Sequence, residues 1–110
     1  MGKTTESKLS ILVVDDDENI LLVLRQSLEK EGYHVNTVKS GEEALKTLQR
    51  SFFHVVITDI MMGEMSGVEL LIEIKKMNSL MQIFVMTSHS TLPRVIQCMQ
   101  GGHMIFLKNL

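Results

Sequence analysis

The chain has 110 residues, of which 45% are hydrophobic, and a formal net charge of −2. This size and apolar content suit one core, so we expect residues 1–8 to be a disordered N-terminal segment and residues 9–110 to be one domain. Lys and Arg are scattered rather than clustered, which argues against direct binding to nucleic acid. One cysteine cannot form an internal disulfide, and no segment is apolar enough to cross a membrane, so we expect a cytoplasmic protein without membrane contact.

The first half of the sequence predicts two strands and two helices in alternation. Residues 9–14 form an apolar, β-branched run typical of a strand, and residues 18–31 predict a helix that Gly32 ends. Residues 35–38 predict a short strand, and the pattern Ser40-Gly41-Glu42-Glu43 is a capping box that starts a second helix. The residues expected on the buried faces of the two helices are Ile20, Leu24, Leu28, Ala44, Leu45 and Leu48.

The second half continues the alternation. Residues 54–58 predict a strand, and Ser66-Gly67-Val68-Glu69 is a second capping box. Residues 82–86 predict a fourth strand, a helix with Pro93 near its first turn should run to Gln100, and residues 104–107 predict a fifth strand. The helix after Ser66 should bury Leu70, Leu71 and Ile74.

Five strands separated by single helices favour parallel pairing, because parallel neighbours need a crossover and a helix supplies it. The predicted fold class is therefore α/β, with a doubly wound, five-stranded parallel sheet. Strand segments such as ILVV lack alternating polarity, as expected for strands buried on both faces. Ligands of such sheets bind beyond the carboxyl ends of the strands, which is where functional residues should lie.

Several polar residues follow the predicted strands and should meet at that edge of the sheet. Singly, an Asp there is often a helix cap, a Thr a turn residue and a Lys a solvated charge. Together, the carboxylates would repel one another by about 4 kcal/mol per pair at 4 Å and an effective dielectric of about 20, which calls for a cation. Oxygen ligands without His or Cys favour Mg²⁺. The residues concerned are Asp15, Asp16, Asp17, Asp59, Thr87, Ser88 and Lys108.

Four motifs occur together and in order: ILVVDDDEN, VVITDIMM with Gly67 eight positions after its acid, VMTSH, and FLK after a glycine pair. In this combination the sequence resembles the receiver domain of two-component response regulators over nearly all of residues 9–110. The resemblance implies the flavodoxin-like strand order 2-1-3-4-5. The family's fifth helix would follow the last strand, so we expect the domain to be truncated after that strand.

The resemblance also implies a phosphorylation site. Asp59 would accept a phosphoryl group from a sensor histidine kinase or a phosphotransfer protein. Asp16, Asp59 and the backbone carbonyl of Met61 would hold Mg²⁺, and Asp15 would act through bound water.

Two further residues complete the implied site. Lys108 would neutralise charge on the transferring phosphoryl group, and Thr87 would hydrogen-bond the new phosphate and couple it to a conformational change. The chain would then be a signalling switch that catalyses only its own phosphorylation and dephosphorylation, rather than an enzyme acting on other substrates.

Two other functions stay open at this point. A haloacid-dehalogenase-like phosphatase also uses a strand-end Asp and Mg²⁺, and residues 15–17 would supply its paired acids, although Asn19 stands where a Thr is expected. A receiver-shaped interaction module without phosphorylation is the second alternative. It is favoured by Gly63 and Asn109, which replace prolines usual in the family, and by Ile105, which replaces an aromatic residue.

The expected absence of a fifth helix predicts a bare sheet face. That face would include apolar residues of the first and fifth strands that the first helix cannot cover. A large uncovered apolar patch favours association, so we expect a homodimer. The residues concerned are Ile11, Val13, Ile105 and Leu107.

Overall fold

The computed structural model describes residues 9–59 and 65–86. Its strands are β1 (Ser10–Val14), β2 (His34–Val38), β3 (Val55–Asp59) and β4 (Gln82–Met86), and its helices are α1 (Glu18–Lys30), α2 (Gly41–Arg50) and α3 (Gly67–Met77). The strands form a parallel sheet in the order β2-β1-β3-β4. The predicted α/β class and the order of its first four strands are therefore confirmed. The expected helix that runs to Gln100 and the expected strand at 104–107 lie outside the described residues.

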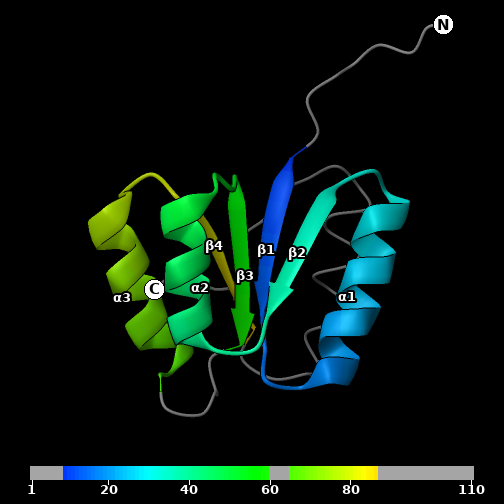
Figure 1. Cartoon of the computed structure of the whole chain (residues 1–110), viewed down its shortest axis with the longest axis horizontal. Coiled ribbons are helices and arrows are strands. Elements are labelled where there is room, and N and C mark those ends of the chain that lie inside the picture. The colour runs from blue at the N-terminus through cyan, green and yellow to red at the C-terminus, as the bar shows by residue number, and fades with distance from the viewer. Residues whose placement is uncertain (1–8, 60–64, 87–110) are drawn as a thin grey trace, which may run out of the picture.

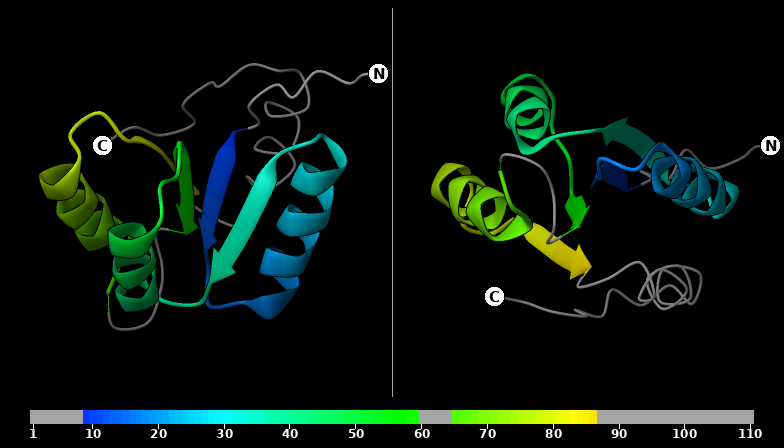
Figure 2. Two further views of the ribbon diagram at one scale, coloured as in Figure 1. Left: turned by 45° about the horizontal axis from the view of Figure 1, so that its top comes forward. Right: turned by 90° about the horizontal axis from the view of Figure 1, so that it is seen from below.

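The helices cover both faces of the sheet. Figures 1 and 2 show α1 on one face and α2 with α3 on the other. Along β1, Ile11 and Val13 belong to the core under α1, whereas Leu12 and Val14 belong to the core under α2 and α3. None of these four side chains is exposed, because β1 is an inner strand with a helical layer on each side. Among the helices of the described residues, none is long and apolar enough to span a membrane.

The expected bare face is wrong where the structure describes it. Ile11 and Val13 have no exposed surface. They pack in one cluster with α1 and with residues of β2, β3 and β4, so side chains of the neighbouring strands enclose them together with the helix. Ile105 and Leu107 lie outside the described residues. The expectation of a homodimer therefore has no support from this face.

The buried face of α1 differs by one residue from the prediction. Leu21, Leu24 and Leu28 are buried, and Ile20 is only partly buried. The spacing i, i+3, i+7 keeps these three leucines on one stripe, which explains why Leu21 takes the place predicted for Ile20. On the other face, the predicted burial of Ala44, Leu70, Leu71 and Ile74 is confirmed, and Leu45 and Leu48 are partly buried.

The two predicted capping boxes have different outcomes. At α3, the Ser66 hydroxyl accepts from the Glu69 N–H at 3.1 Å and the Glu69 carboxylate accepts from the Ser66 N–H at 2.9 Å, which is the complete motif. At α2, the Ser40 hydroxyl accepts from the Glu43 N–H at 3.1 Å, as predicted. The Glu43 carboxylate, however, accepts from the N–H of Lys39, one residue earlier than the motif requires.

Gly32 ends α1 in the way the sequence predicts. Its φ of +98° lies in the left-handed region that favours glycine. Its N–H donates to the Glu29 carbonyl at 2.9 Å, and the Tyr33 N–H donates to the Leu28 carbonyl at 3.2 Å. These two bonds form a Schellman motif, which satisfies carbonyls that the helix end would leave without partners.

Gly32→Ala should lower the free energy of unfolding by about 1 kcal/mol. A Cβ at this position would meet no atom within 4 Å, so the loss would come from the backbone conformation alone. Gly32→Asn should lose less, because Asn tolerates the left-handed region. Urea unfolding of the three proteins measures the difference, and equal losses for Ala and Asn would show that φ is not the cause.

Candidate functional site

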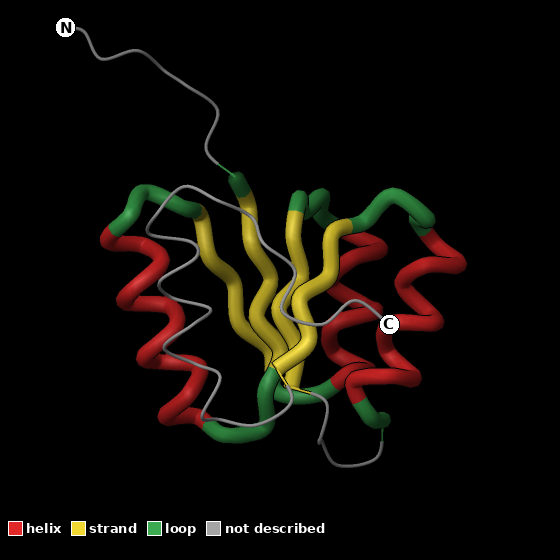
Figure 3. The backbone as a smooth tube through the Cα atoms, turned by 180° about the vertical axis from the view of Figure 1, so that it is seen from behind, coloured by secondary structure: helices red, strands yellow, loops and turns green. Residues whose placement is uncertain are grey.

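The carboxyl ends of β1 and β3 lie next to each other, and an acid stands at each. The register pairs Val14 with Thr58, so the next residues, Asp15 and Asp59, follow neighbouring strands at the same level. Adjacent strands are about 4.8 Å apart, which brings side chains at these positions together. Figure 3 shows the strands from behind, with α1 on one side and α2 and α3 on the other.

Three predicted metal ligands converge in the structure. One carboxylate oxygen from each of Asp15, Asp16 and Asp59 lies within 4.8 Å of the other two. Asp15 is fully buried, Asp59 is 5% exposed, and Asp16 is exposed. The remaining predicted site residues, Met61, Thr87, Ser88 and Lys108, lie outside the described residues.

The acidic triplet after β1 divides into two structural roles. The Asp15 N–H donates to the Val38 carbonyl of β2 at 3.2 Å, and the Asp15 carboxylate accepts from the Asp17 N–H at 2.9 Å. Asp17 is the N-cap of α1, where its carboxylate accepts from the Asn19 N–H at 2.8 Å. Asp17 therefore caps the helix, while Asp15 and Asp16 join the cluster with Asp59.

Asp59 is the last residue of β3, one residue later than the predicted end of the strand. It pairs in register with Met86 of β4, and this pairing extends the ladder to the acid itself. The hydroxyl of Thr58, a fully buried residue, donates to the Asp59 carbonyl at 3.1 Å. Asp59 thus projects from a strand with a neighbour on either side, which fixes its backbone more firmly than a loop would.

An ion pair at the same edge of the sheet was not predicted from the sequence. Lys39, which follows β2, binds the carboxylate of Glu18 at the start of α1. The hydrogen bond and charge of Lys39 lower the pKa of Glu18, and Glu18 in turn raises the pKa of Lys39. Both side chains are more than half exposed, so the pair should contribute little to stability. The sequence signal for this pair is positional: Lys39 follows the predicted strand 35–38, and Glu18 begins the predicted helix 18–31.

The cluster has the donor set of a hard divalent cation. Its three ligands are carboxylates, and no His or Cys belongs to the group that the described residues form. Two like charges about 4 Å apart repel by about 4 kcal/mol at an effective dielectric of about 20, and a cation would remove that cost. The exposed Asp16 leaves room for water around an ion, as Mg²⁺ requires. The residues present therefore fit Mg²⁺.

Solved structures share the fold and a substantial part of the sequence. The response regulator TrrA from Thermotoga maritima, in complex with Mg²⁺-BeF, is 34% identical and superposes with a TM-score of 0.72, over 93% of this chain and 88% of that one. The complex of the histidine kinase ThkA with TrrA gives 41% identity and a TM-score of 0.70, over 76% of this chain and 71% of that one.

Sequence relatives agree with the structures. The transcriptional regulatory protein GlrR of Escherichia coli K12 is 39% identical over 97 residues, which are 88% of this chain. The chain spans 22% of the length of GlrR. The family model for the response regulator receiver domain matches residues 11–109. The chain therefore belongs to the receiver domain family of two-component response regulators.

Proposed function

We propose that the chain is a phosphoacceptor switch in which Asp59 receives a phosphoryl group from a phosphohistidine of a sensor histidine kinase or phosphotransfer protein. The observation that carries the proposal is the convergence of the Asp15, Asp16 and Asp59 carboxylates within 4.8 Å at the ends of two neighbouring strands. The complex of TrrA with the histidine kinase ThkA and the complex of TrrA with Mg²⁺-BeF support it by similarity. Such a switch would act in the cytoplasm.

The transfer would be a displacement at phosphorus. A carboxylate oxygen of Asp59 would form the new P–O bond, and the P–N bond to the imidazole would break with its electron pair left on the nitrogen, giving an aspartyl phosphate. Because Asp59 ends a paired strand and is nearly buried, its oxygen would be held in a fixed direction toward the donor. Because the carboxylate is already held in place, less conformational entropy would be lost in the transition state than for a freely moving carboxylate.

The acids would hold Mg²⁺ in the same site. Asp16, Asp59 and the backbone carbonyl of Met61 would be ligands, and Asp15 would act through a bound water. When bound, the ion would neutralise charge that develops on the phosphoryl oxygens. The Asp17 N–H donates to one oxygen of the Asp15 carboxylate, and this bond would orient the other oxygen toward the cluster.

Lys108 would supply a second positive charge to the phosphoryl oxygens, and Thr87 would report the reaction. Thr87 is the residue after Met86, which pairs with Asp59, so its position in the sequence supports a hydrogen bond to the new phosphate. Drawing Thr87 toward the phosphate would bias the segment after β4 between two arrangements and change the surface it presents.

The family match favours this switch over a haloacid-dehalogenase-like phosphatase, because receiver domains are in general signalling switches rather than enzymes that turn over free substrates. Labelling with a small phosphodonor distinguishes this switch from an interaction module that is not phosphorylated.

Incubation with acetyl phosphate and Mg²⁺ should add one phosphoryl group, and Asp59→Asn should abolish the addition. Intact mass spectrometry measures both. Asp17→Asn is the matched control, because it removes one charge from the same edge but leaves the three clustered acids in place. Full labelling of the Asp59→Asn protein would exclude Asp59 as the acceptor. No labelling of the native chain would favour the interaction module.

A further inference from the structure

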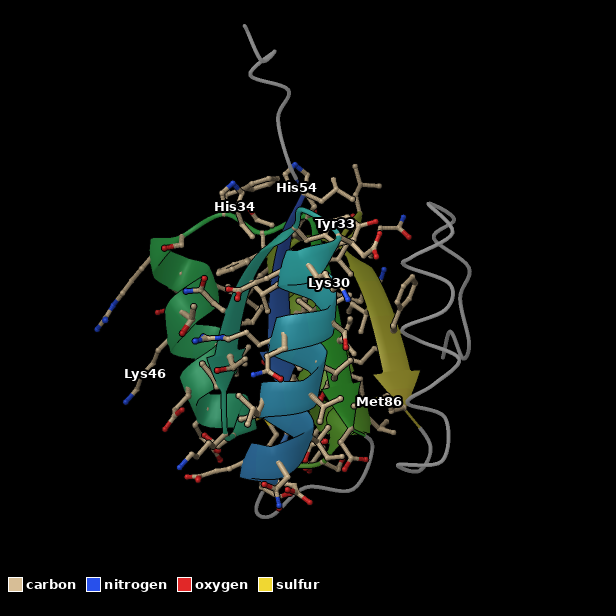
Figure 4. All side chains as sticks on the ribbon, turned by 90° about the vertical axis from the view of Figure 1, so that its right-hand side faces the viewer. Lys30, Tyr33, His34, Lys46, His54 and Met86 are labelled. Carbon is tan, nitrogen blue, oxygen red and sulfur yellow. The ribbon has the colours of Figure 1, made fainter. Side chains whose placement is uncertain are left out.

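A second candidate site lies at the end of the domain opposite the acidic cluster. A pocket of about 300 Å³ opens there between the C-terminal ends of α2 and α3. Strand β3 runs from the end of the domain that holds the pocket to the end that holds the acidic cluster, and its length from Val55 to Asp59 is about 13 Å. In Figure 4 His54, next to the pocket in sequence, lies at the top of the molecule and Met86, the register partner of Asp59, near the bottom. The pocket therefore takes no part in the proposed phosphorylation site.

The pocket has a buried apolar floor and an exposed apolar rim. Phe53, Ile74 and Met81 form the floor and are at most 7% exposed. Phe52 and Met77 lie at the rim and are 69% and 45% exposed. The Phe52 ring packs edge-on against His54, with centroids 4.8 Å apart, which limits its motion. Large apolar residues that gather around a hollow mark a binding site more often than single exposed ones do.

The wall formed by the α3–β4 turn is fixed by hydrogen bonds. The Asn78 N–H donates to the Ile74 carbonyl at 2.8 Å, and the Met81 N–H donates to the Asn78 carbonyl at 3.1 Å. The Lys75 ammonium donates to the Met81 carbonyl at 2.8 Å and to the Ser79 carbonyl at 3.3 Å. A pocket with such a wall exists before a ligand arrives, so binding would cost little ordering of the protein.

The charges around the pocket favour an anion. Arg50 lines it, and none of the lining residues in the described part of the chain is acidic. Lys75 donates to the wall of the pocket, whereas the neighbouring Lys76 forms an ion pair with Glu73 and adds no net charge. The C-termini of α2 and α3 each oppose this with roughly half a negative charge, which the charges of Arg50 and Lys75 together exceed.

We propose that this pocket binds a small amphipathic carboxylate, with its apolar body on Phe53, Ile74 and Met81 and its carboxylate on Arg50. The volume lies at the lower end of the roughly 300–1,000 Å³ of small-molecule sites, so a single alkyl chain or a fused aromatic ring fits better than a segment of a folded partner. The Arg50 guanidinium can hold a carboxylate with two hydrogen bonds, which sets the orientation of the ligand.

Titration of the full chain with octanoate, 1-octanol and 2-naphthoate, followed by amide chemical shifts, tests the proposal. Octanoate should saturate shifts at Arg50, Phe52 and Met77, with an affinity about fivefold above that of octanol, the size expected for an exposed charge pair. The comparison of octanoate with naphthoate identifies the preferred apolar body. Shifts confined to the acidic cluster, or equal affinities for octanoate and octanol, would overturn the proposal.

Arg50→Gln and Phe52→Ala test the contacts of the carboxylate and of the apolar body separately, with Lys46→Gln as the control. Arg50→Gln should weaken octanoate about fivefold and leave octanol unchanged. Lys46→Gln removes the same charge from an exposed position of α2 that does not line the pocket, so it should change neither ligand. Phe52→Ala should weaken both. A second copy of the chain could occupy the pocket instead of a small carboxylate. Light scattering would then show a dimer that octanoate does not dissociate, and this result would overturn the proposal.

Discussion

Without divalent ions, the Asp59→Asn chain should be more stable than the native chain by about 2 kcal/mol in the free energy of unfolding. In the native chain, three carboxylates lie within 4.8 Å of one another, and two of them are buried. Replacing Asp59 by a neutral side chain of the same shape removes two of the three repulsive pairs. The expected gain is smaller than the full Coulomb energy, because the exposed Asp16 is screened by water and salt.

Mg²⁺ should reverse this order. A ligand that binds only the folded state stabilises it by about 2.7 kcal/mol at a hundred times its dissociation constant, and the native chain holds all three acids. The Asp59→Asn chain should gain much less. Chemical unfolding with and without Mg²⁺ measures both effects, with Asp17→Asn as the control that behaves like the native chain. A native chain that is no less stable than the variant without Mg²⁺, or that gains nothing from Mg²⁺, would contradict a cation site at this cluster.

Leu24→Ala should lower the free energy of unfolding by about 3 kcal/mol. Leu24 is fully buried at the centre of the face of α1 that contacts the sheet, in one cluster with residues from all four strands. Removing its branched end would lose apolar burial and leave a cavity that the strands cannot fill, because each is held by a ladder. Denaturant unfolding at equilibrium measures the loss.

Leu22→Ala is the matched control for Leu24→Ala. Leu22 belongs to the same helix and carries the same side chain, but it is 52% exposed. Its truncation should change the free energy of unfolding by less than about 0.5 kcal/mol. Equal losses at the two positions would mean that α1 packs through a different face from the one described.

Much of the fold could be predicted because local signals agree with one another. The apolar runs, the capping serine at α3 and the glycine after α1 each specify an element or its end, and the structure has them in these places. The errors occur where tertiary contacts decide. Whether Ile20 or Leu21 is buried depends on the rotation of α1 against the sheet, and the burial of Ile11 and Val13 depends on neighbours that no single segment reveals.

For the site, the sequence could predict which edge of the sheet carries the acids but not how each acid is used. Parallel strands bring their carboxyl ends together, so Asp15 and Asp59 had to be close once β1 and β3 were neighbours. Which acid of the triplet caps α1 depends on the turn geometry, and the structure assigns the cap to Asp17. The bond between Lys39 and Glu18 depends on side-chain reach across that edge, which spacing along the chain does not give.

Chemical trapping of the phosphorylated residue identifies the acceptor carboxylate directly. An acyl phosphate is reduced by borohydride to an alcohol, so an aspartyl phosphate at position 59 becomes homoserine in a known peptide. After treatment of the full chain with acetyl phosphate and Mg²⁺, then borohydride, we predict homoserine at Asp59 and unchanged Asp at positions 15, 16 and 17. Homoserine at one of the other three acids, or at none of the four in a chain that has gained a phosphoryl group, would show that Asp59 is not the phosphoacceptor.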